Sequence, residues 1–368
     1  MKKIYFDNNA TTKIDPLVAE VILAELQETP SNPSSIHQLG QKAKAKLFKA
    51  RQTVANYLQV RPVEIFFNSG ATEGLNTILR SVAQKKEAHI ITTDLEHACL
   101  YKTFKFLEGR GSDITYLKPK EKGRVDVKDL ESAIKNTTAL IAISWVNSET
   151  GIKTNIEEIA NWCEQNSIPL LIDGVAILGK EKINLPKGVT YACFSGHKIH
   201  GPQGVGFSVI RQGVKIEPLL IGGEQEGGLR AGTENVAGIM GLAKAIELIP
   251  SDVEQKISKL RDFFELELTK IPSIMINGAN QPRVCNVSNV AFLNEDGESL
   301  LARLDRAGVI VSLGSACASG ALEPSRVLLN MGYSKDRVMS SIRFSFSRMN
   351  TLEEIQEALH LLFQILNR

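Results

Sequence analysis

The stretch FSGHKIHGPQGVG, residues 194–206, carries the side chains in this sequence that are best suited to chemistry. His197 and His200 could bind a metal ion, the glycines could let the backbone cradle a phosphate, or Lys198 could act as a reactive amine. The metal interpretation is the weakest, because two histidines three residues apart in a glycine-rich loop have no nearby carboxylate or cysteine as a third ligand. The phosphate and amine interpretations depend on partners elsewhere in the chain.

Asp173 ends the strongly apolar segment IPLLID, residues 168–173. A carboxylate at the end of a buried strand loses water and needs a partner. That partner could be structural, as in a helix N-cap or a salt bridge, or it could be the positive charge of a bound cofactor. Pyridoxal phosphate needs a lysine amine for its Schiff base and an acidic partner for its ring nitrogen, so Lys198 and Asp173 together would suit it.

A phosphate site could form in FFNSGATEG, residues 66–74, where a turn leads into a predicted helix. Backbone N–H groups at a helix start attract anions, and Thr72 could add a hydroxyl group. The same turn could equally be an ordinary helix cap. Ser195 and His197, beside the candidate lysine, could complete a phosphate cup with Thr72.

Two further polar clusters lie where ligands gather in an α/β sheet, at the ends of predicted strands. His97 in DLEHACL is placed near a predicted helix start and could be structural or functional. Asn147 and Glu149 in WVNSETG follow a buried strand and could form only a capped turn.

The elements that must position these residues alternate between about residues 63 and 210. Most of the β-rich segments are nearly continuous in apolar residues, as expected of strands covered on both faces. This alternation predicts an α/β domain around a mostly parallel sheet flanked by helices. The predicted strands are 63–67, 88–93, 113–117, 140–146, 168–173, 191–195 and 205–210, and the predicted helices between them are 71–84, 127–135 and 156–166.

The chain beyond about residue 250 has a different pattern. It predicts a long helix over 253–271, a strand over 340–348 and an amphipathic helix over 351–368. We therefore expect two domains. The large cofactor-binding α/β domain would span 13–250, and a smaller α+β domain would combine 1–12 with 251–368.

The composition excludes several classes of protein. The net charge is only +2, with 43 basic and 41 acidic residues, so no broad basic surface for nucleic acid or an anionic membrane is indicated. The apolar runs are too short to span a bilayer, and the first residues do not resemble a signal peptide. The cysteines are odd in number and widely spaced, which favours a reducing cytoplasm over a disulfide framework; they are Cys99, Cys163, Cys193, Cys285 and Cys317.

A series of sequence blocks resembles the NifS/IscS-type cysteine desulfurases, a branch of the class-V aminotransferase family within the fold-type-I pyridoxal-phosphate enzymes. The blocks run nearly from end to end in the family's order, which makes the resemblance specific. They are YFDNNATT (5–12), NPSSIHQLG (32–40), SGATEGLN (69–76), EHACL (96–100), NSETG (147–151), SGHKIHGPQGVG (195–206), GGEQEGGLRAGTEN (222–235), GSACASGALEPSRVLLNMG (314–332) and SIRFSFSR (341–348).

The resemblance implies how the cofactor, pyridoxal 5'-phosphate, would be held. Lys198 would carry it as a Schiff base, Asp173 would pair with its pyridinium nitrogen, and His97 would stack on its ring and move protons. The phosphate would be bound by Ala71, Thr72, Ser195 and His197.

The resemblance also implies a substrate site and a partner subunit. Asn147 and Arg343 would hold the carboxylate of L-cysteine. Thr233 would reach the phosphate of a partner subunit, which implies a homodimer.

Cys317 is the nucleophile that the resemblance implies. Its surroundings, SLGSACASGALEPS, are small and poor in large apolar side chains, which predicts an exposed thiol. It would take the sulfur of L-cysteine as a persulfide and leave L-alanine. The sulfur would pass to an iron–sulfur scaffold or another sulfur-acceptor protein, such as a tRNA-thiolation relay. The other four cysteines are predicted to be structural, in helices or strands.

The sequence departs from the family pattern three residues after Asp173. The family has a glutamine there that donates a hydrogen bond to the phenolic oxygen of the cofactor, whereas this chain has Ala176. The loss of a donor predicts a raised pKa for the Schiff base. Gly227, Ala231 and Gln203 are smaller departures, at positions where the family has arginine, serine and lysine.

Two alternatives remain open on the sequence. Another fold-type-I enzyme, such as a selenocysteine lyase or an aminotransferase, would keep Lys198 and Asp173. A catalytically weakened homologue could act as a binding partner in cluster assembly, which Ala176 favours. Cys317 speaks against a plain aminotransferase, which has no use for the thiol, and together with Lys198, Asp173 and His97 it speaks against a weakened homologue.

Overall fold

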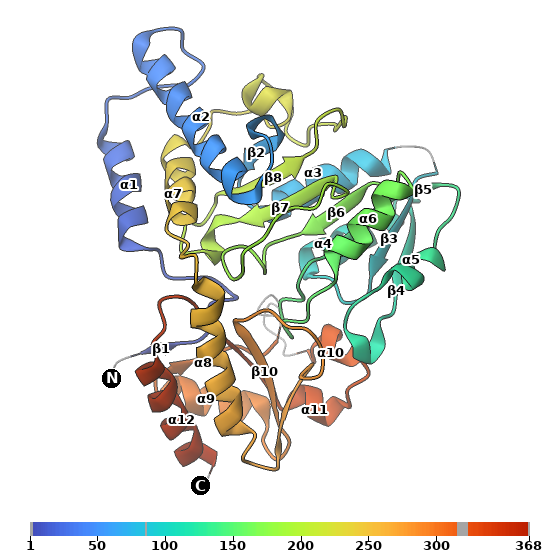
Figure 1. Cartoon of the computed structure of the whole chain (residues 1–368), viewed down its shortest axis with the longest axis vertical. Coiled ribbons are helices and arrows are strands. Elements are labelled where there is room, and N and C mark those ends of the chain that lie inside the picture. The colour runs from blue at the N-terminus through green and yellow to red at the C-terminus, as the bar shows by residue number, and fades with distance from the viewer. Residues whose placement is uncertain (1–2, 85–86, 315–322, 367–368) are drawn as a thin grey trace.

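A seven-stranded sheet forms the centre of the large body of the molecule (Figure 1). The computed structural model describes residues 3–84, 87–314 and 323–366. Four of the six strand pairings are parallel, and β8 runs antiparallel to both of its neighbours. The predicted mostly parallel α/β sheet is therefore confirmed. In sheet order the strands are β2 (Ile65–Asn68), β8 (Gly206–Ile210), β7 (Tyr191–Ser195), β6 (Leu170–Asp173), β5 (Thr138–Ser144), β3 (His89–Thr93) and β4 (Asp113–Leu117).

Helices cover both faces of this sheet, so alternate residues of each central strand enter different hydrophobic clusters. In β7, Ala192 and Phe194 pack in the cluster under α2, α6 and α7, whereas Tyr191 and Cys193 pack under α3 and α4. This double coverage explains why the strands are nearly continuous in apolar residues. The helices are α1 (Pro16–Gln27), α2 (Gln38–Leu58), α3 (Ala71–Ala83), α4 (Ala98–Glu108), α5 (Val127–Glu131), α6 (Ile156–Gln165) and α7 (Val236–Glu247).

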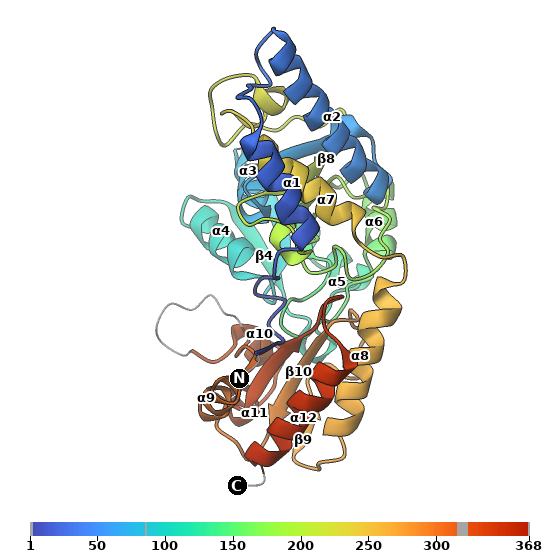
Figure 2. The same ribbon diagram turned by 90° about the vertical axis from the view of Figure 1, so that its left-hand side faces the viewer.

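A smaller body lies below the seven-stranded sheet and contains both ends of the described chain (Figures 1 and 2). Its antiparallel sheet has the order β12 (Ser341–Ser345), β10 (Val287–Phe292) and β9 (Ile274–Ile276). Helices α8 (Val253–Leu268) and α12 (Leu352–Leu366) pack together beside it. The remaining elements are α9 (Gly297–Arg306), α10 (Arg326–Asn330), α11 (Lys335–Met339) and the short parallel pair β1 (Ile4–Tyr5) and β11 (Val309–Ile310).

The N-terminal segment belongs to the small body through strand pairing and aromatic packing. Strand β1 pairs with β11, and Phe6 packs edge-on against Phe346 with ring centroids 5.0 Å apart. The exact domain limits, 13–250 against 1–12 with 251–368, stay a prediction. None of the helices in the described part of the chain is long and apolar enough to cross a membrane.

The strand and helix predictions hold at the centre of each element and differ mainly at the ends. The helix expected over 127–135 ends at Glu131. The strand expected over 340–348 is shorter than predicted and spans only Ser341–Ser345. Cys285 corrects the expectation for the cysteines, because it lies in a turn before β10 rather than in a helix or strand, although it is buried.

Gly206 allows the turn before α3 to lie against β7 and β8. A Cβ atom at this position would be 2.4 Å from the carbonyl oxygen of Phe194 and 2.6 Å from the Cα of Gly70. Both contacts are with backbone atoms, which have little freedom to move away. The glycine thus brings the start of α3 next to Ser195, which ends β7.

We predict that Gly206→Ala lowers the free energy of unfolding in urea by about 1–3 kcal/mol, because the added methyl group overpacks two backbone segments. Gly109→Ala is the matched control, since Gly109 has an ordinary helical φ of −61° and the nearest atoms to an added Cβ are 3.6 Å away. The control should be neutral or slightly stabilising. Equal effects of the two substitutions would contradict this account of Gly206.

Candidate functional site

Polar side chains meet where β5, β6 and β7 end, next to the start of α3. Ser144 of β5 pairs in register with Asp173 of β6, which in turn pairs with Cys193 of β7. Ser195 then ends β7, and its Oγ accepts a hydrogen bond of 2.9 Å from the backbone N–H of Ala71. The structure therefore brings the predicted residues of three segments to one edge of the sheet, as the positions of ligands in parallel sheets require.

Asp173 is a buried carboxylate, with 7% of its surface exposed. Its Oδ1 accepts a hydrogen bond of 3.0 Å from the N–H of Val175. Burial raises the pKa of Asp173, while the charges of His97 and Lys198 act in the opposite direction. A carboxylate in this position favours a cationic partner.

Lys198 ends the 3₁₀ turn Gly196–Lys198 that follows β7. Its Nζ donates hydrogen bonds to the carbonyl oxygens of Asn9 and Ala10. The hydroxyl group of Thr12 donates to the carbonyl oxygen of His197 at 2.7 Å, and the Thr12 N–H donates to the same oxygen at 3.0 Å. The N-terminal segment thus fixes both the backbone and the amine of the lysine turn.

His197 is a neutral imidazole in this environment. Burial and, to a smaller extent, the charge of Lys198 lower its pKa to about 4. Its Nδ1 lies 3.1 Å from the Oγ1 of Thr11. A neutral ring has one N–H to donate, which suits a hydrogen bond to an anion but supplies no positive charge.

The start of α3 is an open helix N-terminus. Its N-cap is Gly70, which has a positive φ of 149° and offers no side chain to the first N–H groups. Ala71 is buried, whereas Thr72, the next residue, is exposed. Together with Ser195 and His197, these residues form an anion-binding arrangement of the kind that helix starts provide.

His97 is the N-cap of α4, as the sequence predicted. Its Nδ1 accepts a hydrogen bond of 3.2 Å from the N–H of Cys99. A neutral ring whose Nδ1 accepts carries its proton on Nε2. The side chain is exposed, so the ring is available to a ligand placed over Asp173.

Glu96, which the sequence analysis did not single out, connects the ends of β3 and β5 through hydrogen bonds. Its carboxyl group is buried and accepts hydrogen bonds from Thr93 Oγ1 at 2.7 Å and from Ser144 Oγ at 2.5 Å. Burial and, to a smaller extent, the negative charge of Asp173 raise the pKa of Glu96 to about 7. The only clue to Glu96 in the sequence is that it directly precedes His97. Its hydrogen bond with Ser144 follows from the fold alone.

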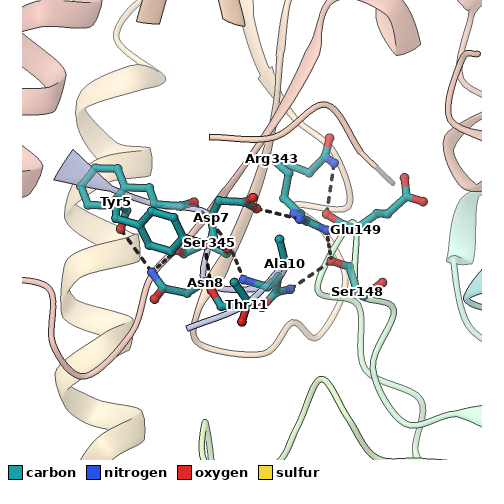
Figure 3. Close-up of polar contacts among 12 residues, drawn as sticks. Tyr5, Asp7, Asn8, Ala10, Thr11, Ser148, Glu149, Arg343 and Ser345 are labelled. Carbon is teal, nitrogen blue, oxygen red and sulfur yellow. Dashed lines mark hydrogen bonds and ion pairs between the residues drawn. The ribbon is translucent and has the colours of Figure 1, made fainter. Parts of the chain in front are cut away.

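Arg343 is held at the boundary between the two bodies (Figure 3). Its guanidinium group donates to Asp7 Oδ1 at 2.9 Å and to the carbonyl oxygen of Ser148 at 3.3 Å. Its Nε is buried and has no hydrogen-bond partner within the described residues. A buried guanidinium with an unused donor favours an additional anion, such as a carboxylate. The sequence did not reveal Asp7 as its partner.

Asn147 holds the turn that carries Ser148. Its Oδ1 accepts from the N–H groups of Glu149 and Thr150, each at 3.0 Å, and its Nδ2 donates to the carbonyl oxygen of Leu95 at 3.1 Å. The capped turn considered from the sequence is therefore present. The amide N–H that Nδ2 does not use on Leu95 is the one group that Asn147 could offer to a ligand.

Glu149, in the same turn, is a buried carboxyl group whose pKa is raised by burial. It accepts a hydrogen bond of 2.5 Å from Ser325 Oγ. A Cβ atom at Gly314 would lie 3.0 Å from Glu149 Oε2. The chain on both sides of residues 315–322 therefore meets at Glu149.

The other predicted site residues have different outcomes. Thr233 is exposed in the loop before α7, where a second subunit could contact it. Cys317 lies outside the described residues. The four described cysteines are free thiols, and burial raises the pKa of each of them.

His200 has a structural position rather than a place in a metal site. It is 2% exposed with a positive φ of 66°, and its Nδ1 contacts the carbonyl oxygen of Lys13 at 2.8 Å. Its backbone N–H donates to Thr12 Oγ1 at 2.7 Å. Within residues 3–84, 87–314 and 323–366, no three His, Cys, Asp or Glu side chains are grouped so that they could hold a metal ion.

Comparisons with known proteins agree with this geometry. Residues 4–358 match the family model described as Aminotransferase class-V. A cysteine desulfurase of Nostoc sp. is 42% identical over 100% of this chain and 94% of its own length. A cysteine desulfurase IscS of Methanosarcina thermophila is 40% identical over 100% of this chain and 93% of its own length.

Solved structures show the same likeness. A NifS-like protein superposes with a TM-score of 0.92 at 36% identity and covers 99% of each chain. The structure of SspA in complex with cysteine superposes with a TM-score of 0.86 at 32% identity, over 95% of this chain and 100% of that one.

We predict that acid weakens the fold partly through His200. Burial, the charge of Lys180 and other neighbours lower its pKa from 6.5 to about 4. Between these values the unfolded chain binds a proton that the folded chain does not, so the free energy of unfolding falls as the pH drops from 6.5 to 4. The contribution is about 3 kcal/mol at most.

His200→Asn tests this, because asparagine tolerates a positive φ and keeps an N–H donor for Lys13 but does not titrate. Urea unfolding at a series of pH values should show a smaller loss of stability in the variant than in the wild type. His360→Asn, on the exposed side of α12, is the control and should follow the wild type. Parallel pH curves for His200→Asn and wild type would rule out this contribution.

Proposed function

Because this chain belongs to the aminotransferase class-V family and is a cysteine desulfurase, we propose that Lys198 and Asp173 hold pyridoxal 5'-phosphate and that Cys317 receives the sulfur of L-cysteine. L-alanine is the other product. The observation that carries this proposal is the buried carboxylate of Asp173 at the end of β6, whose pKa the charges of His97 and Lys198 lower against the effect of burial.

The described residues fit this cofactor at both of its ends. Asp173 suits a protonated ring nitrogen, because its burial favours a hydrogen-bonded cation over water. The open start of α3, with Ala71 and Thr72, suits the phosphate together with Ser195 and His197. Thr233 of a partner subunit would complete the phosphate site in a homodimer.

Pyridoxal phosphate, when bound, supplies an electron sink that allows the α-carbon of an amino acid to lose a proton. Lys198 Nζ is the base that takes this proton. His97 would hold or pass a proton through Nε2 when the cofactor is bound, because its Nδ1 is engaged with Cys99. Asp173 would hold the ring nitrogen of the bound cofactor.

The substrate carboxylate is bound by Arg343 and Asn147. The buried Nε of Arg343, which has no partner in the described part of the chain, supports this role. Asp7 and Ser148 fix the guanidinium group, so that it needs no reorganisation when the carboxylate arrives. The cysteine named in the complex with SspA, a relative at 32% identity, supports the same substrate here.

Cys317 then attacks the substrate sulfur as a thiolate. An S–S bond forms, the C–S bond breaks, and its electron pair stays on the β-carbon, which takes up a proton. The products are L-alanine and a persulfide on Cys317. The persulfide sulfur passes to an iron–sulfur scaffold or another acceptor protein in the cytoplasm.

Lys198→Ala should abolish alanine and sulfide formation from L-cysteine, because no other amine takes the α-proton. Cys317→Ser should reduce the rate of alanine formation at least 100-fold, since a hydroxyl group does not accept the sulfur. Both products are measured after incubating the purified, cofactor-loaded protein with L-cysteine. Absence of alanine from the yellow wild-type protein would defeat the proposal, and full alanine production by Cys317→Ser would favour another fold-type-I enzyme.

Ala176→Gln should lower the pKa read from the visible absorbance of the bound cofactor. Glutamine can donate a hydrogen bond to the phenolic oxygen, which is worth about 1 kcal/mol and hence somewhat less than one pH unit. Ala176→Leu is the control, because it adds a comparable volume without a donor. Identical titration curves for wild type and Ala176→Gln would contradict this explanation of Ala176.

A further inference from the structure

Lys180 lies behind the lysine turn and has no part in the mechanism above. It follows β6 in a run of turns and is only 2% exposed. Its Nζ donates a hydrogen bond of 2.8 Å to the backbone carbonyl oxygen of Lys198. A lysine is almost never fully buried unless it is paired, so this placement calls for an explanation.

In the part of the chain that the structure describes, no carboxylate pairs with the ammonium group of Lys180. Among residues 3–84, 87–314 and 323–366, it forms no ion pair, and the adjacent Glu181 pairs instead with Lys153 at 2.8 Å. The charge of Lys180 therefore acts on the site unscreened by an acid or by bulk water.

The titratable groups that face Lys180 come from several elements. Cys285, in the turn before β10, donates its thiol hydrogen to the Lys180 carbonyl oxygen, and burial raises the pKa of that thiol to about 12. His200 is neutral above about pH 4, and Arg348 is paired with Asp15 at 2.7 Å. The remaining group is Lys198 itself.

The two lysines disfavour each other's charge. Burial lowers the pKa of Lys180 to about 8, and the charge of Lys198 contributes to the lowering. Such coupling is reciprocal, so a positive Lys180 favours the uncharged form of Lys198 by the same amount. The hydrogen bond to the Lys198 carbonyl also fixes the backbone from which the reactive side chain extends.

We propose that Lys180 is a positioning residue of the site, which holds the Lys198 backbone through its ammonium group and uses its unneutralised charge to favour the uncharged nitrogen of Lys198. This inference rests on the proposed role of Lys198. It explains why an amine is buried at this place where an apolar side chain would pack at lower cost.

Titration of the visible absorbance of the holoenzyme tests the proposal without relying on turnover. Lys180→Met removes both charge and donor, and Lys180→Gln keeps a donor but removes the charge. In both variants the absorbance midpoint should rise by about one pH unit, because the protonated form of the Lys198 nitrogen is no longer repelled. Lys180→Arg, which keeps the charge, should stay near the wild-type midpoint.

Lys153→Met is the matched control, because Lys153 is a neighbouring lysine that is paired with Glu181 and partly exposed. It should titrate like the wild type. An unchanged midpoint in Lys180→Gln or Lys180→Met, or an equal shift in Lys153→Met, would overturn the proposal. If Lys180→Met does not fold, Lys180→Gln and Lys180→Arg decide the question.

A failure of the proposal for Lys180 can be distinguished from a failure of the proposed cofactor role of Lys198. If the wild-type absorbance changes with pH and Lys198→Ala loses that change, Lys198 carries the cofactor whatever the Lys180 variants do. A failure confined to the Lys180 variants then refutes only the role of Lys180.

Discussion

A carboxylate buried at the end of a strand is the constraint on which this site depends. Asp173 loses most of its water when β6 is covered on both faces, and such a charge is stable only beside cations and hydrogen-bond donors. His97 and Lys198 come to it from the segments after β3 and β7, and the N–H of Val175 from the following turn. The order of the strands in the sheet therefore determines which charged side chains lie near Asp173.

The N-terminal segment is the second component of the site, and it connects the two bodies. Phe6 packs in the small body against Phe346, and Asp7 pairs with Arg343 of β12. A few residues later, Thr12 bonds to the carbonyl oxygen of His197 in the large body. Arg343, for which we propose the substrate carboxylate as a ligand, and the turn that ends at Lys198 are therefore both held by one short stretch of chain.

The sequence predicted those parts of the site that follow from strand ends. Asp173, Ser195 and Lys198 were identified because an apolar strand followed by a polar residue marks the edge of a sheet, and the resemblance supplied roles for His97 and Arg343. Asn9, Asp7 and Lys180 were not assigned, because each acts through a contact with residues distant in sequence. No feature of the sequence distinguishes Lys180 from an exposed lysine, and only the fold shows that it is buried.

The long separations within the site have a consequence for how the protein is made. Asp7 emerges from the ribosome 336 residues before its partner Arg343, and Asn9 emerges 189 residues before Lys198. At about 5–20 residues per second, synthesis leaves the early segment without these partners for many seconds. The seven-stranded sheet can assemble in that interval, but the guanidinium group of Arg343 can reach Asp7 only after β12 has been synthesised. The ion pair between Asp7 and Arg343 is therefore among the last contacts of this region to form in each new chain.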